Sequence, residues 1–543
     1  MDPVKAVFAY HEATKHFPNR FARSLGYLDW ANQPDPFRRF EGTAVHRLPL
    51  LTEDVTPPYD ALFGGKTFPK PLTRDTVGAF FEHSLAISAW KEYRGDRWAL
   101  RCNPSSGNLH PTEGYAVLGP LEGIHDAPAV YHYAPKEHAL ERRADISANA
   151  WEALTASVPE NAFLVGLSSI YWREAWKYGE RAYRYCQHDV GHAFGALAVS
   201  AAALGWRMRW LDMPADAEVA ALLGLSRIAD FVAEETEHPD LLAVVWPDES
   251  PERSKALDIP LAAFEQAARS KWHGKANRLS PEYVPWTAIE EVAAAVAKPR
   301  TKPRTPINPA MPSPTVPATE ESARSIILQR RSAQAMDGKS AMPRETFYRT
   351  LARLMPDRYG PVWEAFGASP QVNLILFAHR VIDFPAGMYC LVRNPDHEES
   401  LRTAMRQNFA WSKPEGCPQD LPLFLLKGGD YQRLAGQLSC GQDIASDGAF
   451  AVAMLAALEE PLDAIGPWYY RALFWETGMI GQLLYLEAEA AGLRGTGIGC
   501  YFDELVHGVL GLEGPRFQCL YHFTVGGPID DPRLSTLPPY GRR

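Results

Sequence analysis

The sequence lacks paired cysteines, long apolar runs and an excess of positive charge. Its seven cysteines are scattered and form no CxxC motif, so the pattern favours neither a disulfide scaffold nor a cysteine zinc site. The longest apolar run, Ala193–Trp206, contains two glycines and is too short to span a bilayer. The first residues show no signal-peptide pattern. We therefore expect a cytoplasmic, reduced protein with no membrane partner.

The charge balance argues against a second class of partner. The 543 residues carry a formal net charge of −10, and the pI is near 5.9. A chain of this charge is a poor match for nucleic acid or for anionic lipid. Apolar residues make up 46% of the sequence, which is typical of a globular protein. The length is sufficient for roughly two to four domains.

A proline-rich stretch divides the chain. Residues 298–319 contain seven prolines and almost no large apolar side chains. Such a composition is typical of an extended, semi-rigid linker. We predict an N-terminal extension over residues 1–70, a first domain over residues 71–297 and a second domain over residues 320–543.

The two halves share one spaced pattern. Each has a tyrosine, an acid six residues later, a glycine two residues after that and a second glycine after fourteen more. These residues are Tyr183, Asp189, Gly191 and Gly205 in the first half, and Tyr470, Glu476, Gly478 and Gly492 in the second. Both halves also have a tyrosine-centred apolar strand upstream, at Ala129–Tyr133 and Gly387–Val392. The pattern predicts one long helix in each half, packed together as an internal dimer. The alternative is two unrelated domains with ordinary buried helices.

A polar, turn-rich segment, RCNPSSGNLHP, occupies residues 101–111. Pro104 fixes its own φ, and the single glycine permits a backbone angle that other residues resist. Ser105, Ser106 and Asn108 supply short donors and acceptors that suit a flat ligand with polar edges. By composition alone, the segment is equally compatible with a surface turn before a strand.

Together with four further segments, this turn resembles the nitroreductase family of flavoproteins, in particular its branch of SagB and thiazoline-oxidase type dehydrogenases. The further segments are AWKYGERAYRYCQHDVGHA at 175–193, QRRSAQ at 329–334, AAGLRGTGIGCYFDELVHGVLGL at 490–512 and YHFTVGGPIDDPRLSTLPPY at 521–540. The resemblance implies an α+β chain of two nitroreductase-like, FMN-dependent domains that form an intramolecular pseudo-dimer.

The resemblance also implies a division of labour between the halves. Family members usually bind FMN where two subunits meet, with the Pro-Ser turn from one subunit and the Arg-Arg-Ser and Gly-rich stretches from the other. Here the turn occurs only in the first half, and its counterpart, Phe366–Asn373, has lost the pattern. Arg330–Ser332 and Gly495–Gly499 occur only in the second half, whereas the first half has the bulky Trp206–Trp210. We therefore expect one complete site, and one FMN, per chain.

The resemblance also implies roles for individual residues. Arg330 and Ser332 match the family's phosphate ligands, and Arg533 is a further candidate. The Gly-rich stretch would bring N–H groups to the isoalloxazine edge, and Arg101 with Asn108 would lie near its N1 and O2 atoms. Without the resemblance, the double arginine would fit a solvated helix face. The full predicted set of cofactor-binding residues is Arg101, Pro104, Ser105, Ser106, Asn108, Arg330, Arg331, Ser332, Gly495, Thr496, Gly497, Ile498, Gly499 and Arg533.

Lys177 and Tyr178 are the predicted catalytic residues, because thiazoline-oxidase type enzymes similarly use a Lys-Tyr pair near the flavin. Removal of a hydride from a carbon requires a base for the adjoining proton. A buried lysine, or a tyrosine beside a cation, can serve as that base. The alternative is that the lysine stem packs on Trp176 and that the tyrosine lies at the domain surface.

The segment His188–His192 offers a rival interpretation. It places two histidines at i and i+4 on a helix, which is the spacing of zinc metallohydrolases. The internal glycine and the lack of a third ligand at characteristic spacing argue against a metal. A structural role in the interdomain packing is the simpler interpretation.

We therefore expect an FMN-dependent dehydrogenase or oxidase that acts on a small molecule or a peptide and returns to the oxidised state with oxygen or another acceptor. The alternatives are an NAD(P)H-dependent reductase of nitro compounds or quinones, and a flavin-binding protein without turnover. The sequence names neither the substrate nor the acceptor. It also leaves open whether the chain is monomeric or assembles further, and what the N-terminal extension does.

Overall fold

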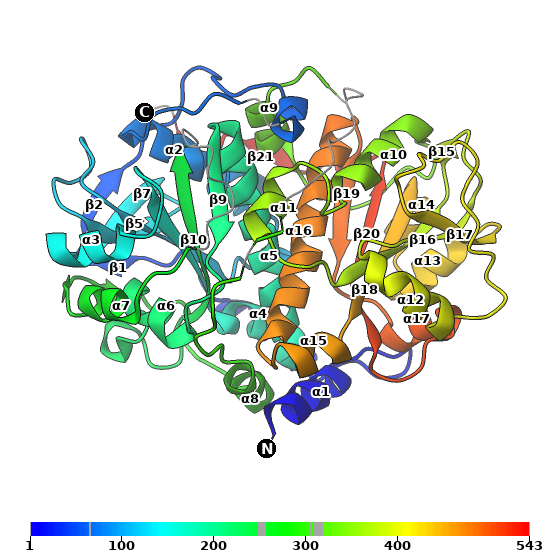
Figure 1. The fold of residues 1–543 in the computed structure, drawn as a ribbon, viewed down its shortest axis with the longest axis horizontal. Helices are drawn as coiled ribbons and strands as arrows, with labels where there is room; N and C mark the ends of the chain where they lie inside the picture. Colours follow the sequence, from blue (N-terminus) through cyan, green and yellow to red (C-terminus); the bar gives the residue numbers. More distant parts are fainter. Residues whose placement is uncertain (1, 65–66, 248–256, 305, 308–318, 542–543) are drawn as a thin grey trace.

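Two antiparallel sheets flank a central pair of long helices in the computed structural model (Figure 1). The structure describes residues 2–64, 67–247, 257–304, 306–307 and 319–541. The antiparallel sheets, with helices packed against them, confirm the predicted α+β class. The predicted linker at 298–319 falls partly outside the described residues.

The two sheets have the same strand order. The first runs β11-β7-β6-β5-β8-β10-β9, with β2 beside β7, and the second runs β17-β16-β14-β18-β20-β19. The strands of the first are β2 (Ala44–Arg47), β5 (Thr112–Leu118), β6 (Ala129–Ala134), β7 (Ala139–Asp145), β8 (Phe163–Ser169), β9 (Trp206–Trp210), β10 (His238–Pro247) and β11 (Lys271–Trp272). Those of the second are β14 (Val372–Ala378), β16 (Gly387–Leu391), β17 (Leu423–Gly428), β18 (Phe450–Ala457), β19 (Arg494–Ile498) and β20 (Phe517–Gly526). The tyrosine-centred strands begin where the sequence predicts them, as β6 and β16.

The repeated pattern forms the two long helices, α5 (Ala182–Ala203) and α16 (Tyr469–Ala490). The glycine after each adopts a positive φ, 71° at Gly205 and 70° at Gly492, which is the left-handed conformation that ends many helices. Their backbones touch at the first glycine of each repeat, since a Cβ on Gly478 would lie 2.8 Å from the Cα of Gly191. Small residues at this crossing let the helices approach closely.

Shorter helices surround the two sheets and the central helices; α4 and α11, for example, pack against α5 (Figure 1). They are α1 (Pro3–Ala13), α2 (Arg74–Glu82), α3 (Ala148–Thr155), α4 (Tyr171–Tyr178), α6 (Asp216–Leu223), α7 (Leu261–Ala268), α8 (Thr287–Ala295), α9 (Ala323–Gln329), α10 (Arg344–Arg353), α11 (Pro361–Phe366), α12 (Glu398–Ala404), α13 (Gln432–Leu438), α14 (Ile444–Asp447), α15 (Glu459–Ala464) and α17 (Asp503–Leu510). The short strands β1 (Phe40–Glu41) and β12 (Lys275–Ala276) pair, as do β13 (Met342–Pro343) and β15 (Val381–Ile382). Within the described residues, none of the helices combines the length and apolar content that a membrane crossing requires.

The two ends of the chain each reach across to the other half. Strand β21 (Ser535–Leu537), near the C-terminus, pairs with β3 (Ile87–Tyr93), which also pairs with β4 (Asp96–Arg101). Helix α1 packs on the second half, where the His11 ring hydrogen-bonds with the Tyr470 hydroxyl at 3.0 Å and with the Gln518 side chain at 3.1 Å. The N-terminal extension therefore helps to hold the halves together.

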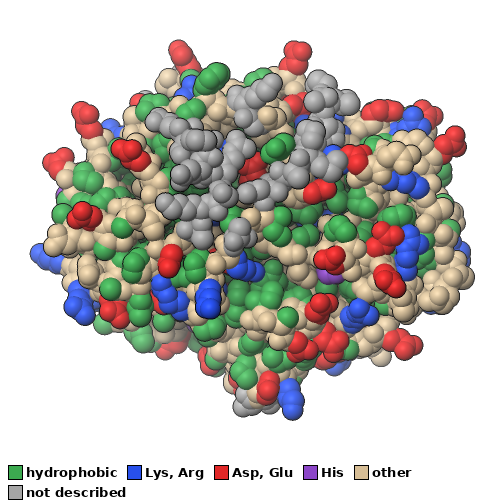
Figure 2. Space-filling view, viewed as in Figure 1, with side chains coloured by type: hydrophobic (Ala, Val, Ile, Leu, Met, Phe, Trp, Pro, Cys, Tyr) green, Lys and Arg blue, Asp and Glu red, His purple; other side chains and the backbone are tan. Residues whose placement is uncertain are grey.

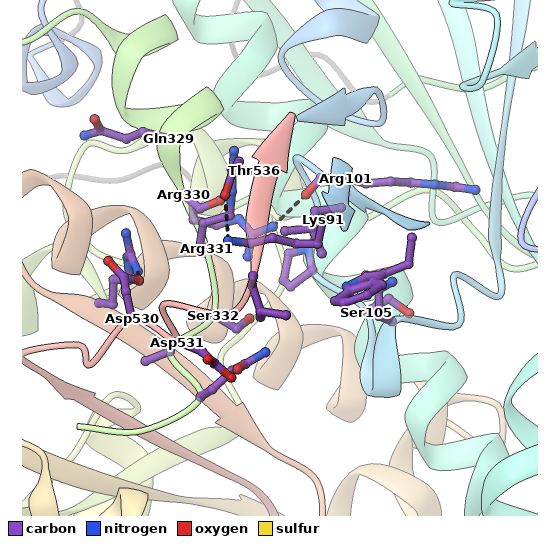
Figure 3. A pocket seen from close by; sticks show the side chains of 18 of the residues that line it. Lys91, Arg101, Ser105, Gln329, Arg330, Arg331, Ser332, Asp530, Asp531 and Thr536 are labelled. Atoms are coloured by element: carbon purple, nitrogen blue, oxygen red, sulfur yellow. Dashed lines mark hydrogen bonds and ion pairs between the residues drawn. The ribbon is translucent and has the colours of Figure 1, made fainter. Parts of the chain in front are cut away.

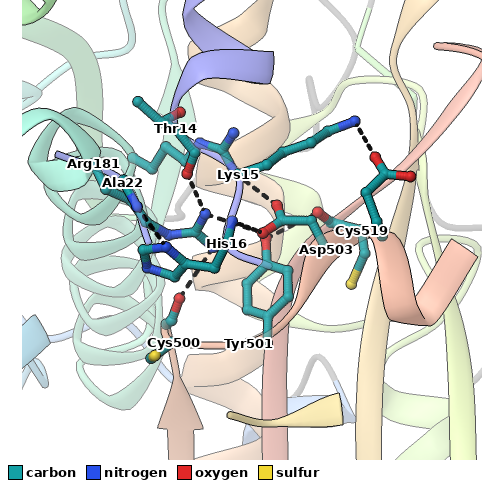
Figure 4. Close-up of polar contacts among 12 residues, drawn as sticks. Thr14, Lys15, His16, Ala22, Arg181, Cys500, Tyr501, Asp503 and Cys519 are labelled. Atoms are coloured by element: carbon teal, nitrogen blue, oxygen red, sulfur yellow. Dashed lines mark hydrogen bonds and ion pairs between the residues drawn. The ribbon is translucent and has the colours of Figure 1, made fainter. Parts of the chain in front are cut away.

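A buried carboxylate, Asp503, fixes this junction (Figure 4). It accepts hydrogen bonds from Arg181 and Arg184 of the first half, at 3.1 and 3.0 Å, and from the backbone N–H of His16 at 2.9 Å. Burial alone would raise the pKa of Asp503, but the two guanidinium groups outweigh it and hold the pKa well below its usual range.

On the face of the molecule shown in Figure 2, acidic and basic side chains are interspersed.

Candidate functional site

A cavity of about 650 Å³ opens where the two halves meet (Figure 3). Its walls come from the turn after β4, from the segment that follows α9, and from the C-terminal stretch before β21. Basic side chains are concentrated in its lining, namely Lys91, Arg101, Arg330, Arg331 and Arg494. The acids Asp530 and Asp531 lie at the same cavity. The balance of charge favours an anionic ligand.

Arg330 links the halves at this cavity. Helix α9 ends just before it, and the residue leaves the helix with φ −51° and ψ 130°. Its Nη2 donates to the Arg101 carbonyl at 2.6 Å, and its guanidinium lies 5.0 Å from the centre of the Tyr485 ring. Its Nε is buried and has no hydrogen-bond partner. Burying a hydrogen-bond donor without a partner costs free energy. We therefore expect a bound ligand to place an acceptor against this atom.

Arg331 mainly connects its own segment to β3. Its guanidinium donates to the Ser88 hydroxyl at 3.2 Å and to the carbonyls of Leu328 and Arg330 at 2.8 and 2.6 Å. Burial, together with the neighbouring Arg330, lowers the pKa of Arg331 to about 10. Burial likewise lowers the pKa of Arg101 to about 10. Arg101 is buried and Arg331 is half-buried, and neither forms an ion pair with a carboxylate of the described residues, so a bound anion would balance their charge.

The glycine-rich segment forms strand β19. β19 lies at the edge of the second sheet, and its residue Gly495 also bridges to Ser332. The Ser332 and Tyr485 hydroxyls are 2.9 Å apart, and the Tyr485 hydroxyl accepts from the Gly497 N–H at 2.9 Å. Ser332 and the glycine strand are therefore fixed against one another through a single tyrosine.

A second cavity of about 270 Å³ adjoins the first and shares Pro104, Ser105 and Ser332 with it. Its lining is largely aromatic and glycine-rich. The aromatic residues are Tyr178, Tyr185, Tyr485 and Tyr521, and the glycines are Gly107, Gly497 and Gly499. Ser106, Thr496 and Ile498 also line it. The two cavities thus form one site with a basic end and a flat, aromatic end.

The turn between the cavities is held by local hydrogen bonds. The Ser105 hydroxyl accepts from the His110 N–H at 2.8 Å, and the Asn108 amide donates to the Ala99 carbonyl at 2.9 Å. Asn108 and Gly107 both have positive φ, near 60°. The positive φ explains the small and amide side chains at these two positions.

Asp189 anchors the same turn from α5. Its carboxylate accepts from the Ser106 N–H at 3.0 Å and from the Ser106 hydroxyl at 3.0 Å. Burial raises the pKa of Asp189 to about 7, although the hydrogen bonds from the serines oppose this shift. The side chain also lines the smaller cavity.

Lys177 and Tyr178, at the end of α4, contact the turn directly. A Cβ on Gly107 would lie 2.6 Å from the Tyr178 hydroxyl and 3.2 Å from the Lys177 Nζ. Burial, followed by Glu174, raises the pKa of Tyr178 well above its usual value. Tyr178 therefore keeps its proton at neutral pH, which suits it to donate a hydrogen bond rather than to act as the base considered from the sequence.

Two predicted residues lie differently from expectation. Arg533 is exposed, forms an ion pair with Asp531 at 2.7 Å and does not line either cavity. The Arg101 side chain points away from Arg330 in Figure 3, and its Nη2 donates to the Pro36 carbonyl at 2.6 Å. The phosphate role predicted for Arg533 thus has no geometric support.

Lys91 and Arg494 also line the cavity, although neither was among the residues predicted from the sequence. Lys91 lies on β3 and donates to the Thr536 hydroxyl at 2.7 Å, so it reaches the cavity only because β21 pairs with β3. Arg494 opens β19 and pairs with Asp530. No local motif marks Lys91. Arg494 could have been found, since it directly precedes the glycine-rich stretch.

The position that mirrors this site in the other half is filled. In the repeat, Trp210 corresponds to Gly497. Its ring stacks on Phe366 at 5.2 Å between centroids and meets Trp475 edge-on at 5.7 Å. Glu476, the counterpart of Asp189, forms a buried ion pair with Arg393. The cavity beside Trp206 measures only about 60 Å³.

His188 and His192, the two histidines of the metal interpretation, pack against residues of the second half. His188 hydrogen-bonds with the Thr477 hydroxyl at 2.9 Å and stacks on Tyr521, and His192 lies 3.2 Å from the Tyr521 hydroxyl. Across the described part of the chain, we find no cluster of three or more His, Cys, Asp or Glu side chains that could hold a metal. The zinc alternative has no support from this geometry.

The residues present fit FMN. One end of the site offers Arg and Lys donors to a phosphate, and the buried Nε of Arg330 has no hydrogen-bond partner among the described residues. The other end is lined by four tyrosines and by Gly497 and Gly499 of the second half, which suits a planar ring. The unpartnered Arg330 donor and the lining of the two cavities both fit this cofactor.

Comparison with known proteins supports the fold. Residues 69–233 match the model of the nitroreductase family. A curated protein of Methanocaldococcus jannaschii, named as a candidate nitroreductase, is 27% identical over 114 residues, which are 20% of this chain and 57% of that protein. A crystal structure named as a candidate nitroreductase of Anabaena variabilis superposes with a TM-score of 0.69 at 21% identity, covering 96% of this chain and 99% of that one. The microcin synthetase complex of E. coli gives a TM-score of 0.27 at 19% identity, over 46% of this chain and 94% of that one. The chain therefore has a nitroreductase-like fold.

Proposed function

We propose that this chain is an FMN-dependent oxidoreductase with one flavin site, assembled from both halves. The observation that carries the proposal is the pair of connected cavities at the seam, basic at one end and aromatic at the other. The turn at residues 104–108 from the first half and Arg330–Ser332 from the second both contribute to its walls. Neither half contains these parts alone.

The phosphate would bind among the cations of the larger cavity. Arg330 and Ser332 would act as donors, and Lys91 and Arg494 would add positive charge. Arg331 would contribute mainly by fixing this segment to β3. The ring would lie in the smaller cavity, with β19 along its edge and the turn at Ser105 against its face.

The filled mirror position supports one flavin per chain. A tryptophan stands where the glycine strand would need an open edge, and aromatic rings and an ion pair occupy the surrounding space. A cavity of about 60 Å³ is too small for a flavin.

When bound, FMN would supply two-electron redox chemistry. The chain's own residues would hold protons in place and orient the substrate. Tyr178, which stays protonated, would orient the substrate by donating a hydrogen bond, and the Lys177 side chain, whose Nζ lies 5.1 Å from the centre of the Tyr178 ring, would stabilise negative charge on the substrate. Asp189 would hold the Ser106 turn in place.

The resemblance to SagB and thiazoline-oxidase type enzymes favours a dehydrogenase or oxidase, with a peptide azoline as the preferred substrate class. The competing NAD(P)H-dependent reductase would use the same cavity. Anaerobic mixing with NADH, with NADPH and with azoline peptides separates the two, because only the true electron donor bleaches the flavin rapidly. Bleaching by nicotinamide alone would overturn the dehydrogenase assignment.

Flavin stoichiometry tests the site itself. The protein is reconstituted with FMN, separated from free flavin, denatured, and its released flavin is compared with the chain concentration. We expect one FMN per chain. Two per chain would contradict the filled mirror position, and none would contradict the flavin assignment.

A further inference from the structure

Two cysteines far apart in the sequence meet at the wall of the smaller cavity. The sulfur atoms of Cys440 and Cys500 lie 2.8 Å apart, and both side chains are partly exposed. The remaining cysteines are buried. Contact at this distance is closer than two uncharged thiols ordinarily approach, and it requires little movement for a bond to form.

The backbone around both residues is prearranged for this contact. Cys440 has a φ of 57°, a left-handed conformation that a residue with a side chain adopts only when its surroundings impose it. The Gln442 amide donates to the Ser439 carbonyl at 2.7 Å and to the Cys500 carbonyl at 3.0 Å. This side chain therefore joins the turn after α13 to the end of β19.

We propose that Cys440 and Cys500 form a redox-active dithiol that exchanges with small-molecule disulfides. In the first step, the Cys500 thiolate attacks the disulfide, forms a mixed disulfide and releases one thiolate. Cys440 then gives up its proton and attacks the Cys500 sulfur, which releases the second thiol. Two protein thiols are oxidised to one disulfide, and one small disulfide is reduced to two thiols.

The electrostatics assign the order of attack. The hydrogen bond between the two sulfur atoms, aided by nearby Arg181, lowers the pKa of Cys500, and the same hydrogen bond raises the pKa of Cys440. Cys500 also lines the cavity directly, beside Gly499, whose carbonyl accepts from the Tyr185 hydroxyl at 3.2 Å. A disulfide between Cys440 and Cys500 would thus fix the end of β19 to the turn after α13.

The purified full-length protein provides the test. It is equilibrated in buffers of increasing oxidised-to-reduced glutathione ratio, alkylated under denaturing conditions, digested and mapped without reduction. We expect the alkylatable cysteines to fall from seven to five as one cross-linked peptide pair, containing Cys440 and Cys500, appears. Dithiothreitol should restore all seven. Because this measurement reports only on the cysteines, its result does not depend on whether flavin is bound.

Single substitutions supply matched controls. Cys440→Ser and Cys500→Ser should each abolish the cross-link, and Cys417→Ser, which changes a buried cysteine elsewhere, should retain it. Seven alkylatable cysteines in the wild-type protein at every glutathione ratio would overturn the proposal. A cross-link that joins either residue to a different cysteine would overturn it equally. Neither result depends on the folding of a variant.

Discussion

Gly191 and Gly478 bring the backbones of α5 and α16 into direct contact. A Cβ built on Gly191 would lie 2.2 Å from the Trp475 carbonyl oxygen and 2.9 Å from the Cα of Gly478. Because these neighbours are backbone atoms, they cannot move aside without shifting a helix. The closeness of the two halves, and with it the width of the seam that holds the site, therefore depends on two hydrogen atoms in place of methyl groups.

Gly191→Ala should destabilise the protein despite alanine's better helix propensity. The propensity gain is about 1 kcal/mol, while the forced separation of the helices costs on the order of 2–4 kcal/mol, so we expect a net loss. Urea unfolding followed by circular dichroism measures it. Gly508→Ala is the control, because a Cβ there meets nothing within 4 Å. An unchanged midpoint for Gly191→Ala would refute the close contact.

Lys91→Met should weaken binding of FMN but not of riboflavin. Loss of one charge-assisted contact to phosphate is worth roughly 1.5–3 kcal/mol, which corresponds to about a 10- to 150-fold rise in the dissociation constant for FMN. Fluorescence titration with both flavins gives the ratio. Arg533→Met should change neither value, since Arg533 is exposed and pairs with Asp531. An equal loss for both flavins would remove Lys91 from the phosphate site.

Tyr178→Phe should slow turnover while leaving flavin affinity unchanged. In the proposed chemistry the lost hydroxyl orients the substrate through a hydrogen bond, so we expect a fall of about 10²- to 10³-fold in the rate of flavin reduction by substrate. Single-turnover stopped flow measures this rate. Tyr27→Phe makes the same chemical change at an exposed site and should behave as the wild type. Lys177→Met should follow Tyr178→Phe, and unchanged rates in both variants would remove the pair from the mechanism.

Asp189 should make stability depend on pH. Its folded-state pKa is raised to about 7, above the unfolded value near 3.9, so folding favours the protonated form. The contribution is complete at a pH below the unfolded pKa and is lost as pH rises through 7. We expect a decline of up to about 4 kcal/mol between pH 4 and pH 8.

Asp189→Asn should remove this decline, because the amide does not titrate. Urea unfolding free energies at four pH values between 5 and 8 test it, and the difference between variant and wild type isolates this one group. Glu265→Gln, at an exposed position, should keep the wild-type slope. Parallel profiles for Asp189→Asn and the wild type would show that Asp189 ionises normally.

Asp503→Asn should be strongly destabilising. The variant leaves Arg181 and Arg184 buried without their carboxylate, which typically costs about 3–5 kcal/mol. Thermal unfolding measures the loss. Glu504→Gln changes the adjacent, partly exposed acid that pairs with Lys15 and should cost less than about 1 kcal/mol. Similar losses for the two variants would contradict a special role for the buried junction.

The sequence by itself determined the elements and the local parts of the site. The two long helices α5 and α16 were predictable because their spacing and glycines depend on neighbours in the chain, whereas the α+β class was implied by the family resemblance. The same holds for the turn at Pro104–Asn108, whose backbone angles follow from its own residue types.

Only the tertiary structure decided which distant groups share a cavity. Lys91 reaches the site through the pairing of β21 with β3, Asp189 acquires its raised pKa from burial, and Arg533 turns to Asp531 instead of the cavity. The contact between Cys440 and Cys500 is likewise made by two loops that meet in space. Burial and long-range pairing leave no local signature, because they depend on where the whole chain places its surfaces rather than on the residues alongside.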